Sequence, residues 1–192
     1  NRKNFKESLS NVNFSSTNFF IDAAFIDFIE NGEGLSFKHF ESDRVIIIRA
    51  FTKFFGIPGL RLGYSICYNK KWVSTANNLK EPWTINTFAA SCGEILLNSN
   101  KYIEKTYKTL EKEKNRMLNG LKKIENIQVF KSESNFLLIK LMEISGTELY
   151  NKLLEKGFLI RRCENFNFLD DSYVRIAIKD KKKKKYFSVY NF

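Results

Sequence analysis

The chain has 192 residues, of which 43% are hydrophobic and 15% aromatic, so it can bury a core and wholesale disorder is excluded. This length fits one large domain or two small ones. The formal net charge is +11. However, the lysines alternate with glutamates in helical patterns and arginine is scarce, which favours a solvated basic surface over a nucleic-acid-binding site.

Cysteine and histidine usage and the distribution of apolar residues exclude further classes. Cys67, Cys92 and Cys163 lie far apart, and His39 is the single histidine, so no metal site is predicted. The polar start NRKNFKESLS does not resemble a signal peptide, and no apolar run is long enough to span a bilayer. We therefore expect a soluble cytoplasmic protein with reduced, buried thiols.

The first predicted strands flank a loop that carries charged residues. Residues Asn18 to Asp22 form a short apolar run that ends in a carboxylate, as a buried parallel strand does where its C-terminal end meets a crevice. On its own, Asp22 could equally be the N-cap of a following helix. A loop with a short helix is expected over Gly32 to Phe40, followed by strands over Arg44 to Ile48 and Leu62 to Cys67.

Lys53 and Arg61 lie between the second and third predicted strands. Burial at the end of a strand favours the uncharged lysine amine, which can form a Schiff base with a carbonyl. Arg61 follows the turn-forming pair Pro58 and Gly59, so its side chain could return to the same pocket and bind a phosphate through two hydrogen bonds. On spacing alone, both residues could also be ordinary surface charges.

Helices are predicted for the middle of the chain. A short polar helix is expected over Lys70 to Asn78, and an apolar helix over Ile85 to Leu97 with Thr84 as its N-cap. Apolar residues at helical spacing between Ser99 and Ile124 predict a long amphipathic helix whose many charges form a solvated face.

From Ile127 onward the pattern changes to α+β. Arg161 and Arg175 fall on predicted strands, where a guanidinium is the planar donor that a carboxylate or phosphate binds best; taken singly, each could also be an exposed strand-edge residue. Arg162 would point to the opposite face from Arg161. The lysine run from Lys181 to Lys185 is expected to be a solvated tail. The predicted elements are strands over Ile127 to Phe130, Asn135 to Lys140, Phe158 to Arg161 and Tyr173 to Ile178, and a helix over Gly146 to Lys156.

Five stretches of the sequence resemble one enzyme family. The stretch TKFFGIPGLRLGY, which contains Lys53, resembles the lysine signature of the class I and II aminotransferases, which depend on pyridoxal 5'-phosphate (PLP) and have fold type I. This signature is closest to the branch that holds histidinol-phosphate aminotransferase and L-threonine-O-3-phosphate decarboxylase. The stretch LIRRCENFNFLDDSYVRIAIKD closely resembles the decarboxylase pattern within that branch. The other three similar stretches are IDAAFIDF, SESNFLLIKL and EPWTIN, in which the tryptophan, Trp83, favours the decarboxylase.

The resemblance implies roles for five residues. Lys53 would attach the cofactor through a Schiff base, Arg61 would bind the cofactor phosphate, and Asp22 would pair with the pyridine nitrogen, which keeps the ring an electron sink. Arg175 would bind the α-carboxylate of the substrate, and Arg161 would help to bind its phosphate end.

Three positions depart from the family pattern. Ala50 stands where the family has serine or glycine, so no hydroxyl can reach the cofactor phosphate from there. Ala23 replaces the usual glutamate. Phe25 stands where aminotransferases often have a tyrosine that bonds the cofactor's phenolic oxygen, and phenylalanine at this position also fits the phosphothreonine decarboxylases.

The fold implied by the resemblance is α/β, namely the C-terminal part of a fold-type-I PLP-dependent transferase. It would consist of a remnant of the large PLP-binding domain over residues 1–98, a long connecting helix over 99–125 and a small α+β domain over 126–192. The family's upstream phosphate-cradling loop, its ring-stacking aromatic and its N-P-x-N-P asparagine have no counterpart in this sequence. The chain is therefore expected to cover about the C-terminal half of the family.

The implied reaction is decarboxylation of L-threonine O-3-phosphate in cobalamin biosynthesis, and the alternative is the histidinol-phosphate aminotransferase reaction of histidine biosynthesis. An alternative of another class is a non-catalytic truncated fragment that acts, if at all, by binding a partner. The intact family member is expected to be a homodimer that acts on a small phosphorylated amino acid, with no membrane partner and no nucleic acid.

Overall fold

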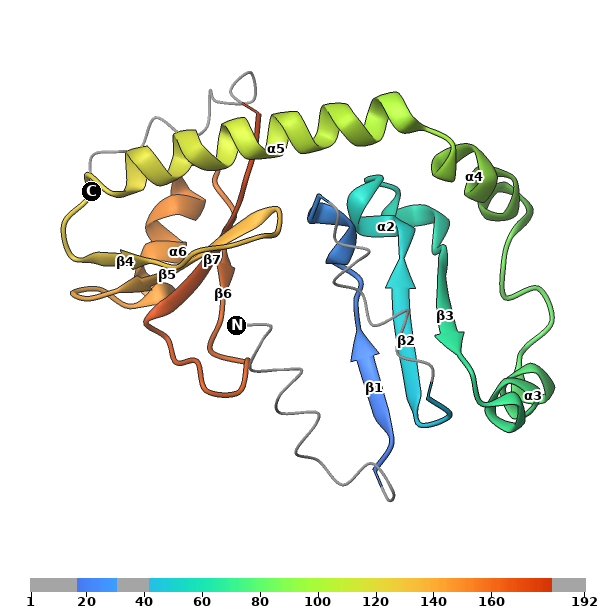
Figure 1. Ribbon diagram of the computed structural model, residues 1–192. Coiled ribbons are helices and arrows are strands. Elements are labelled where there is room, and N and C mark those ends of the chain that lie inside the picture. Colours follow the sequence, from blue (N-terminus) through green and yellow to red (C-terminus); the bar gives the residue numbers. More distant parts are fainter. Residues whose placement is uncertain (1–16, 31–41, 181–192) are drawn as a thin grey trace. The chain divides into compact units, whose positions relative to one another are not determined.

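The computed structural model describes residues 17–30 and 42–180 and divides the chain into two compact units, Asn1–Ser99 and Asn100–Phe192 (Figure 1). The predictions made for the polar N-terminus, for Gly32 to Phe40 and for the lysine run Lys181 to Lys185 lie outside the described residues. In the described part of the chain, every helix is too short or too polar to cross a lipid bilayer.

The first unit is built on a three-stranded sheet in the order β1-β2-β3, with β1 at Phe19–Asp22, β2 at Val45–Ala50 and β3 at Gly63–Cys67. Strand β1 runs parallel to β2, and β3 runs antiparallel to it. The β-branched run of β2 favours the central position. The three predicted strands are therefore confirmed, but the expected burial of β1 is wrong: Phe20 is 69% exposed, and among the described residues β1 is an edge strand that pairs only with β2.

Short helical turns follow the first two strands of this unit. They are η1 at Ile26–Phe28, α2 at Phe51–Phe54 and η4 at Pro58–Leu60. The buried rings of Phe28 and Phe54 pack with centroids 5.3 Å apart, so the turns after β1 and β2 share one small core.

Two longer helices complete the first unit, α3 at Lys70–Leu79 and α4 at Thr87–Leu97. Both helices are confirmed, but the predicted N-cap Thr84 is wrong. Asn86 caps α4 instead: its side chain accepts a hydrogen bond from the Ala89 amide at 2.9 Å and donates one to the Leu60 carbonyl at 3.2 Å. Asparagine is at least as good an N-cap as threonine, and here it also anchors the helix to the η4 turn.

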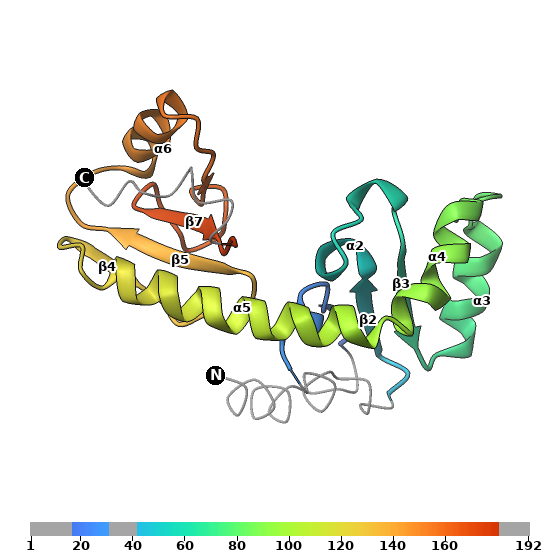
Figure 2. The same cartoon turned by 90° about the horizontal axis from the view of Figure 1, so that it is seen from above.

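The second unit combines a four-stranded antiparallel sheet, in the order β4-β5-β7-β6, with helices α5 and α6 (Figure 1; seen from above in Figure 2). Its core contains side chains from both helices and from the two central strands, among them Met117, Leu137, Leu149 and Val174. The elements are α5 at Asn100–Leu121, β4 at Ile127–Val129, β5 at Phe136–Leu141, α6 at Gly146–Glu155, β6 at Arg161–Arg162 and β7 at Tyr173–Ala177.

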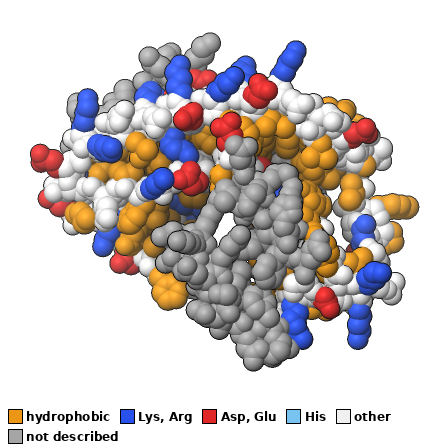
Figure 3. All heavy atoms as spheres, in the orientation of Figure 1, with side chains coloured by type: hydrophobic (Ala, Val, Ile, Leu, Met, Phe, Trp, Pro, Cys, Tyr) orange, Lys and Arg blue, Asp and Glu red, His pale blue; other side chains and the backbone are white. Residues whose placement is uncertain are grey.

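Helix α5 is the long amphipathic helix that its apolar spacing predicts. Leu110, Met117 and Leu121 are buried, while lysine and glutamate side chains are intermixed on its exposed face (Figure 3). Its exposed charged residues are Lys101, Lys105, Lys108 and Lys112 beside Glu104 and Glu111, so this face is solvated, as predicted, and net positive.

Strand β6 begins later than predicted, at Arg161 rather than at Phe158. The preceding residues are used to end α6: the Gly157 amide donates to the Leu154 carbonyl, and the Phe158 amide donates to the Leu153 carbonyl. Gly157 has φ +80°, so this is the Schellman arrangement that ends helices at a left-handed glycine. As a result, β6 is only two residues long, and within residues 17–30 and 42–180 it pairs with β7 alone.

Candidate functional site

Three of the predicted site residues come together at one end of the first unit's sheet. Asp22 is the last residue of β1, and its register partner in β2 is Ile48. Lys53 lies in α2 directly after β2, and Arg61 precedes β3 in a loop that the Phe51 amide closes on the Leu62 carbonyl. In Figure 1 the helix α2 sits at the end of the sheet where β1 and β2 both finish.

Lys53 is exposed, and its Nζ lies 5.8 Å from the ring centroid of Phe25. The burial predicted for this lysine is wrong, because the single turn of α2 buries Phe54 and directs Lys53 outward. The amine is thus open to a ligand, with the aromatic face of Phe25 beside it. A cation over an aromatic ring is a stabilising contact that holds the lysine near this position.

Asp22 presents its carboxylate at the surface and is fixed by its own backbone. Oδ1 accepts a hydrogen bond from the Ala24 amide at 2.9 Å, and the Ala23 amide donates to the Ile48 carbonyl at 2.9 Å. This Asx turn is not a helix cap, since the N-cap of η1 is Phe25. Among the described residues, Oδ2 has no hydrogen-bond partner and can accept a proton donor of a ligand.

Arg61 has a left-handed backbone with φ +52° and ψ +40°. This region costs a side-chain-bearing residue roughly 1–2 kcal/mol. The guanidinium is exposed, and its Nη1 donates a hydrogen bond to the Pro58 carbonyl at 3.0 Å. Backbone strain at a residue whose charged side chain is exposed to solvent is typical of a functional position.

Arg61→Gly is therefore expected to leave stability unchanged or to raise it, while removing the side chain that would bind the cofactor phosphate. Glycine occupies φ > 0 without a steric penalty, whereas Arg61→Ala keeps the strain and loses the same charge. Urea unfolding and PLP titration of the two variants test this. Equal PLP affinity in wild type and Arg61→Gly would contradict a phosphate-binding role.

A second group of predicted site residues lies in the second unit. Arg161 of β6 and Arg175 of β7 are register partners, and directly paired residues of an antiparallel ladder point to the same face. Both line a cavity of about 570 Å³ together with Phe136 and Asn165. Two like charges face each other there, which destabilises the pair unless an anion lies between them.

The charges of these two arginines are not neutralised within the described residues, where neither has an ion-pair partner. Arg161 donates from Nη2 to the neutral Asn165 oxygen at 2.9 Å. The guanidinium carbon of Arg175 lies 4.0 Å from the Phe136 ring centroid and 5.8 Å from that of Phe166. Arg175 Nε is buried without a hydrogen-bond partner in the part of the chain that the structure describes. This buried donor is available to the acceptor of a ligand.

Cys163 lies two residues beyond Arg161 and is fully buried. Burial raises the pKa of its thiol, because the thiolate would lose its hydration, and the nearby charges of Arg175 and Arg161 act in the opposite direction. Cys67 and Cys92 are only half-buried, so the prediction of buried thiols is confirmed for Cys163 alone. All three thiols are free.

The sequence predictions missed a buried ion pair beside the first group. Arg49 of β2 is 6% exposed, pairs with Asp27 of η1 and lies with its guanidinium carbon 5.8 Å from the Tyr64 ring centroid. The available signal was an arginine inside the apolar run IIIRA, which cannot be buried there without a carboxylate partner. The pair joins β2 to the segment that carries Asp22 and Phe25.

The residues at the end of the first sheet fit a phosphorylated aldehyde with a ring nitrogen. The exposed amine of Lys53 can attack a carbonyl, the fixed carboxylate of Asp22 can pair with a protonated ring nitrogen, and the guanidinium of Arg61 can bind a phosphate. PLP carries all three groups, so the chemistry of these three side chains fits this cofactor.

Comparison with known proteins assigns the chain to a family. The model of the family Aminotransferase class I and II matches residues 1–187. The chain belongs to this family, whose members are PLP-dependent enzymes.

Two curated relatives are similar over most of this chain. The threonine-phosphate decarboxylase of Salmonella typhimurium strain LT2 is 33% identical over 162 residues, which are 84% of this chain and 44% of the relative. The histidinol-phosphate aminotransferase of Methanocaldococcus jannaschii is 33% identical over 158 residues, which are 82% of this chain and 42% of the relative. The chain thus spans less than half the length of these curated relatives.

Solved structures agree with the fold. The histidinol-phosphate aminotransferase from Clostridium acetobutylicum matches with a TM-score of 0.87 and 39% identity, covering 96% of this chain and 56% of that one. The L-threonine-O-3-phosphate decarboxylase from Porphyromonas gingivalis matches with a TM-score of 0.80 and 24% identity, covering 97% and 57%. The predicted fold class, the C-terminal part of a fold-type-I PLP-dependent transferase, is confirmed.

Proposed function

We propose that the chain provides the cofactor-binding lysine and the substrate-binding arginines of a PLP-dependent enzyme, with decarboxylation of L-threonine O-3-phosphate in cobalamin biosynthesis as its reaction. The observation that carries this proposal is the pair Arg161 and Arg175, two arginines without a carboxylate partner among the described residues, which line one cavity. A substrate with two anionic groups matches two unneutralised guanidinium groups.

In the first unit, Asp22, Lys53 and Arg61 would hold the cofactor. Bound PLP would supply an electron sink for the pair of electrons left when a bond at the substrate Cα breaks. Lys53 Nζ would attach the cofactor and later deliver a proton to Cα. Asp22 would keep the ring nitrogen protonated, and Arg61 would anchor the phosphate so that the ring stays in place.

In the second unit, Arg175 would bind the α-carboxylate and Arg161 the phosphate of the substrate. The reaction would break the bond between Cα and the carboxylate, releasing CO₂, and a proton would replace it to give the phosphorylated amine. Which bond breaks depends on how the two anionic groups are oriented, and a misplacement of about 1 Å is enough to change reactivity.

Histidinol-phosphate aminotransferase of histidine biosynthesis is the second candidate, favoured by the 39% identity to the Clostridium acetobutylicum structure that carries that name. L-Histidinol phosphate has a phosphate and no carboxylate, so it would occupy both arginines with one anion. The resemblance of the segments around Trp83 and Cys163 to the decarboxylase pattern supports the first candidate. A cytoplasmic location and a homodimeric assembly of the complete enzyme belong to the same proposal.

The test of cofactor attachment is to add PLP to the purified 192-residue chain, reduce with borohydride and map the modified lysines by mass spectrometry. We expect one modified lysine per chain, Lys53, and none at that position in Lys53→Ala. Labelling scattered over surface lysines and unchanged in the variant would contradict the proposal and would support a non-catalytic fragment.

Substrate assays then separate the two reactions. With PLP, the decarboxylase is expected to release CO₂ from O-phospho-L-threonine without an amino acceptor. The aminotransferase is expected to consume L-histidinol phosphate only when 2-oxoglutarate is present. If Lys53 is labelled selectively but neither activity is detected, the 192-residue chain binds PLP without catalysing either reaction.

A further inference from the structure

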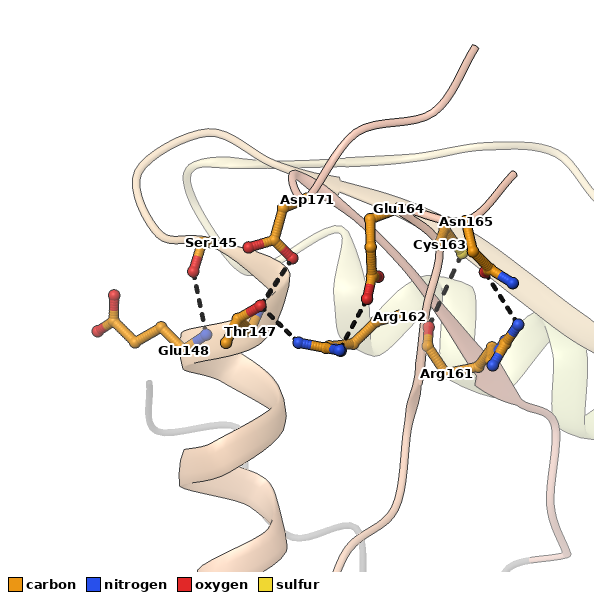
Figure 4. Close-up of polar contacts among 9 residues, drawn as sticks. All are labelled: Ser145, Thr147, Glu148, Arg161, Arg162, Cys163, Glu164, Asn165 and Asp171. Atoms are coloured by element: carbon orange, nitrogen blue, oxygen red, sulfur yellow. Dashed lines mark hydrogen bonds and ion pairs between the residues drawn. The ribbon is translucent and has the colours of Figure 1, made fainter. Parts of the chain in front are cut away.

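Arg162 lies next to Arg161 on β6 but points the other way. In the register of β6 and β7, Arg161 pairs with Arg175, and Arg162 pairs with the buried core residue Val174. The two arginines therefore project to opposite faces of the sheet. Figure 4 shows Arg162 reaching from β6 toward the first turn of α6, while Arg161 lies beside Asn165 on the other side of the strand.

The guanidinium of Arg162 is held by two partners. Nη1 donates to the Thr147 hydroxyl at 2.7 Å, and Nη2 pairs with Glu164 Oε1 at 2.7 Å. Its carbon also lies 5.6 Å from the Tyr150 ring centroid on the next turn of α6. Unlike Arg161, Arg162 has its charge neutralised inside the unit and its donors directed at fixed acceptors.

The Thr147 hydroxyl is itself part of a rigid anchor. It donates to Asp171 Oδ1 at 3.1 Å, and the Thr147 amide donates to the same oxygen at 3.0 Å (Figure 4). The Ser145 side chain caps α6 by accepting from the Glu148 amide at 3.0 Å. A Cβ on Gly146 would lie 2.8 Å from the Asp171 carbonyl, so the helix start and the Asp171 loop are in close contact.

Strand β6 needs such an anchor because its own hydrogen bonding is minimal. It is two residues long and, in the part of the chain that the structure describes, lies at the edge of the sheet and pairs only with β7. Short edge strands open easily, since few hydrogen bonds hold them. The link from Arg162 through Thr147 to Asp171 ties this strand to α6 and to the loop that leads into β7.

We propose that Arg162 is a positioning residue, which holds β6 through Thr147 so that Arg161 faces Arg175 at the spacing an anionic substrate needs. This role rests on the proposed function of Arg161 and Arg175. The Arg162 side chain lies on the face of β6 opposite to Arg161, and its charge is paired with that of Glu164.

The competing explanation is direct contact, because Arg162 also lines the 570 Å³ cavity that runs along this edge of the sheet. The two explanations differ in what they predict for Thr147. Direct contact requires only the guanidinium, whereas positioning requires the hydroxyl that receives it. Thr147→Val removes that hydroxyl and keeps the side-chain shape and the backbone bond to Asp171.

The test compares O-phospho-L-threonine binding to the 192-residue chain and its variants by calorimetry, with thermal unfolding measured alongside. Arg162→Met and Thr147→Val are each expected to weaken binding by about five- to tenfold, and the double variant by no more than either alone. Thr147→Ser should restore wild-type affinity. The matched control is Lys152→Met, which breaks an exposed ion pair on the same helix and should change nothing.

A second readout concerns β6 itself and does not depend on ligand. Amide hydrogen exchange of Arg161 and Cys163 should accelerate about tenfold in Arg162→Met and Thr147→Val, while exchange in β5 stays at the wild-type rate. Faster exchange throughout the unit would show general destabilisation and would overturn a positioning role.

The outcomes distinguish this inference from the proposed function. If wild type binds and Arg161→Met does not, but Thr147→Val binds like wild type, positioning by Arg162 is overturned and the anion site stands. If wild type and all variants fail to bind O-phospho-L-threonine, the anion site of the proposed function is overturned, and the role of Arg162 with it.

Discussion

Replacing Arg175 with methionine is expected to reduce the affinity for O-phospho-L-threonine by about 100-fold, because an interface that loses a buried charged donor forfeits about 2–5 kcal/mol. The guanidinium lies over the Phe136 ring at 4.0 Å, and its Nε is buried without an acceptor among the described residues. Methionine keeps the apolar stem that packs between the rings and removes only the donors and the charge. The loss should therefore appear in binding and not in folding.

Calorimetric titration of the 192-residue chain, without PLP, measures this affinity directly. Lys131→Met is the matched control: it removes one positive charge from the same unit at a side chain that is 89% exposed. It should change the affinity by less than about twofold at physiological salt, since exposed charges are screened. An Arg175→Met variant that binds as tightly as wild type would show that the substrate anion is held elsewhere.

Phosphate and carboxylate contributions can be separated with the same variants. L-Threonine carries only the carboxylate, so its binding should depend on Arg175 and not on Arg161. O-Phosphoethanolamine carries only the phosphate, so its binding should depend on Arg161. If L-threonine binding depended on Arg161 and O-phosphoethanolamine binding on Arg175, the two assigned roles would be exchanged. The site formed by the two arginines would still stand.

Sequence patterns predicted most of the elements because their periodicities are strong. The apolar runs of β2 and β5 and the helical spacing of α5 each match the structure. The same patterns placed Asp22, Lys53 and Arg61 at strand ends, where the first unit brings them to one end of its sheet. Arg161 and Arg175 were predicted separately, and only the register of β6 with β7 shows that they face each other.

The errors arose where several local signals competed. The start of β6 was displaced because Phe158 completes the Schellman turn of α6, a use that β-propensity does not reveal. Asn86 rather than Thr84 caps α4 because it also reaches the Leu60 carbonyl, which is distant in sequence. Lys53 was expected to be buried because it follows a buried strand, but a single helical turn rotates it outward.

The pairing of Arg49 with Asp27 could not be predicted, since it depends on a contact between β2 and the turn after β1. Breaking this ion pair is expected to have a large effect on the stability of the first unit. Asp27→Asn should lower the free energy of unfolding of the first unit by about 2–4 kcal/mol, because it leaves a guanidinium that is 6% exposed without its counter-charge. The Asp27 side chain is 29% exposed, so the expected loss of stability is smaller than for a fully buried ion pair.

Both tryptophans, Trp72 and Trp83, lie in the first unit, so tryptophan fluorescence during urea unfolding reports on that unit alone. The control is Glu133→Gln, which breaks an exposed ion pair in the second unit and should leave the fluorescence transition of the first unit unchanged. The double variant Asp27→Leu with Arg49→Met should recover most of the lost stability, since apolar residues can replace a buried pair. The ion pair holds the segment that carries Asp22 and Phe25 against β2. If apolar packing holds this segment equally well, PLP should still label Lys53 in the double variant. Recovery of stability without labelling would show that the ion pair itself shapes the cofactor site.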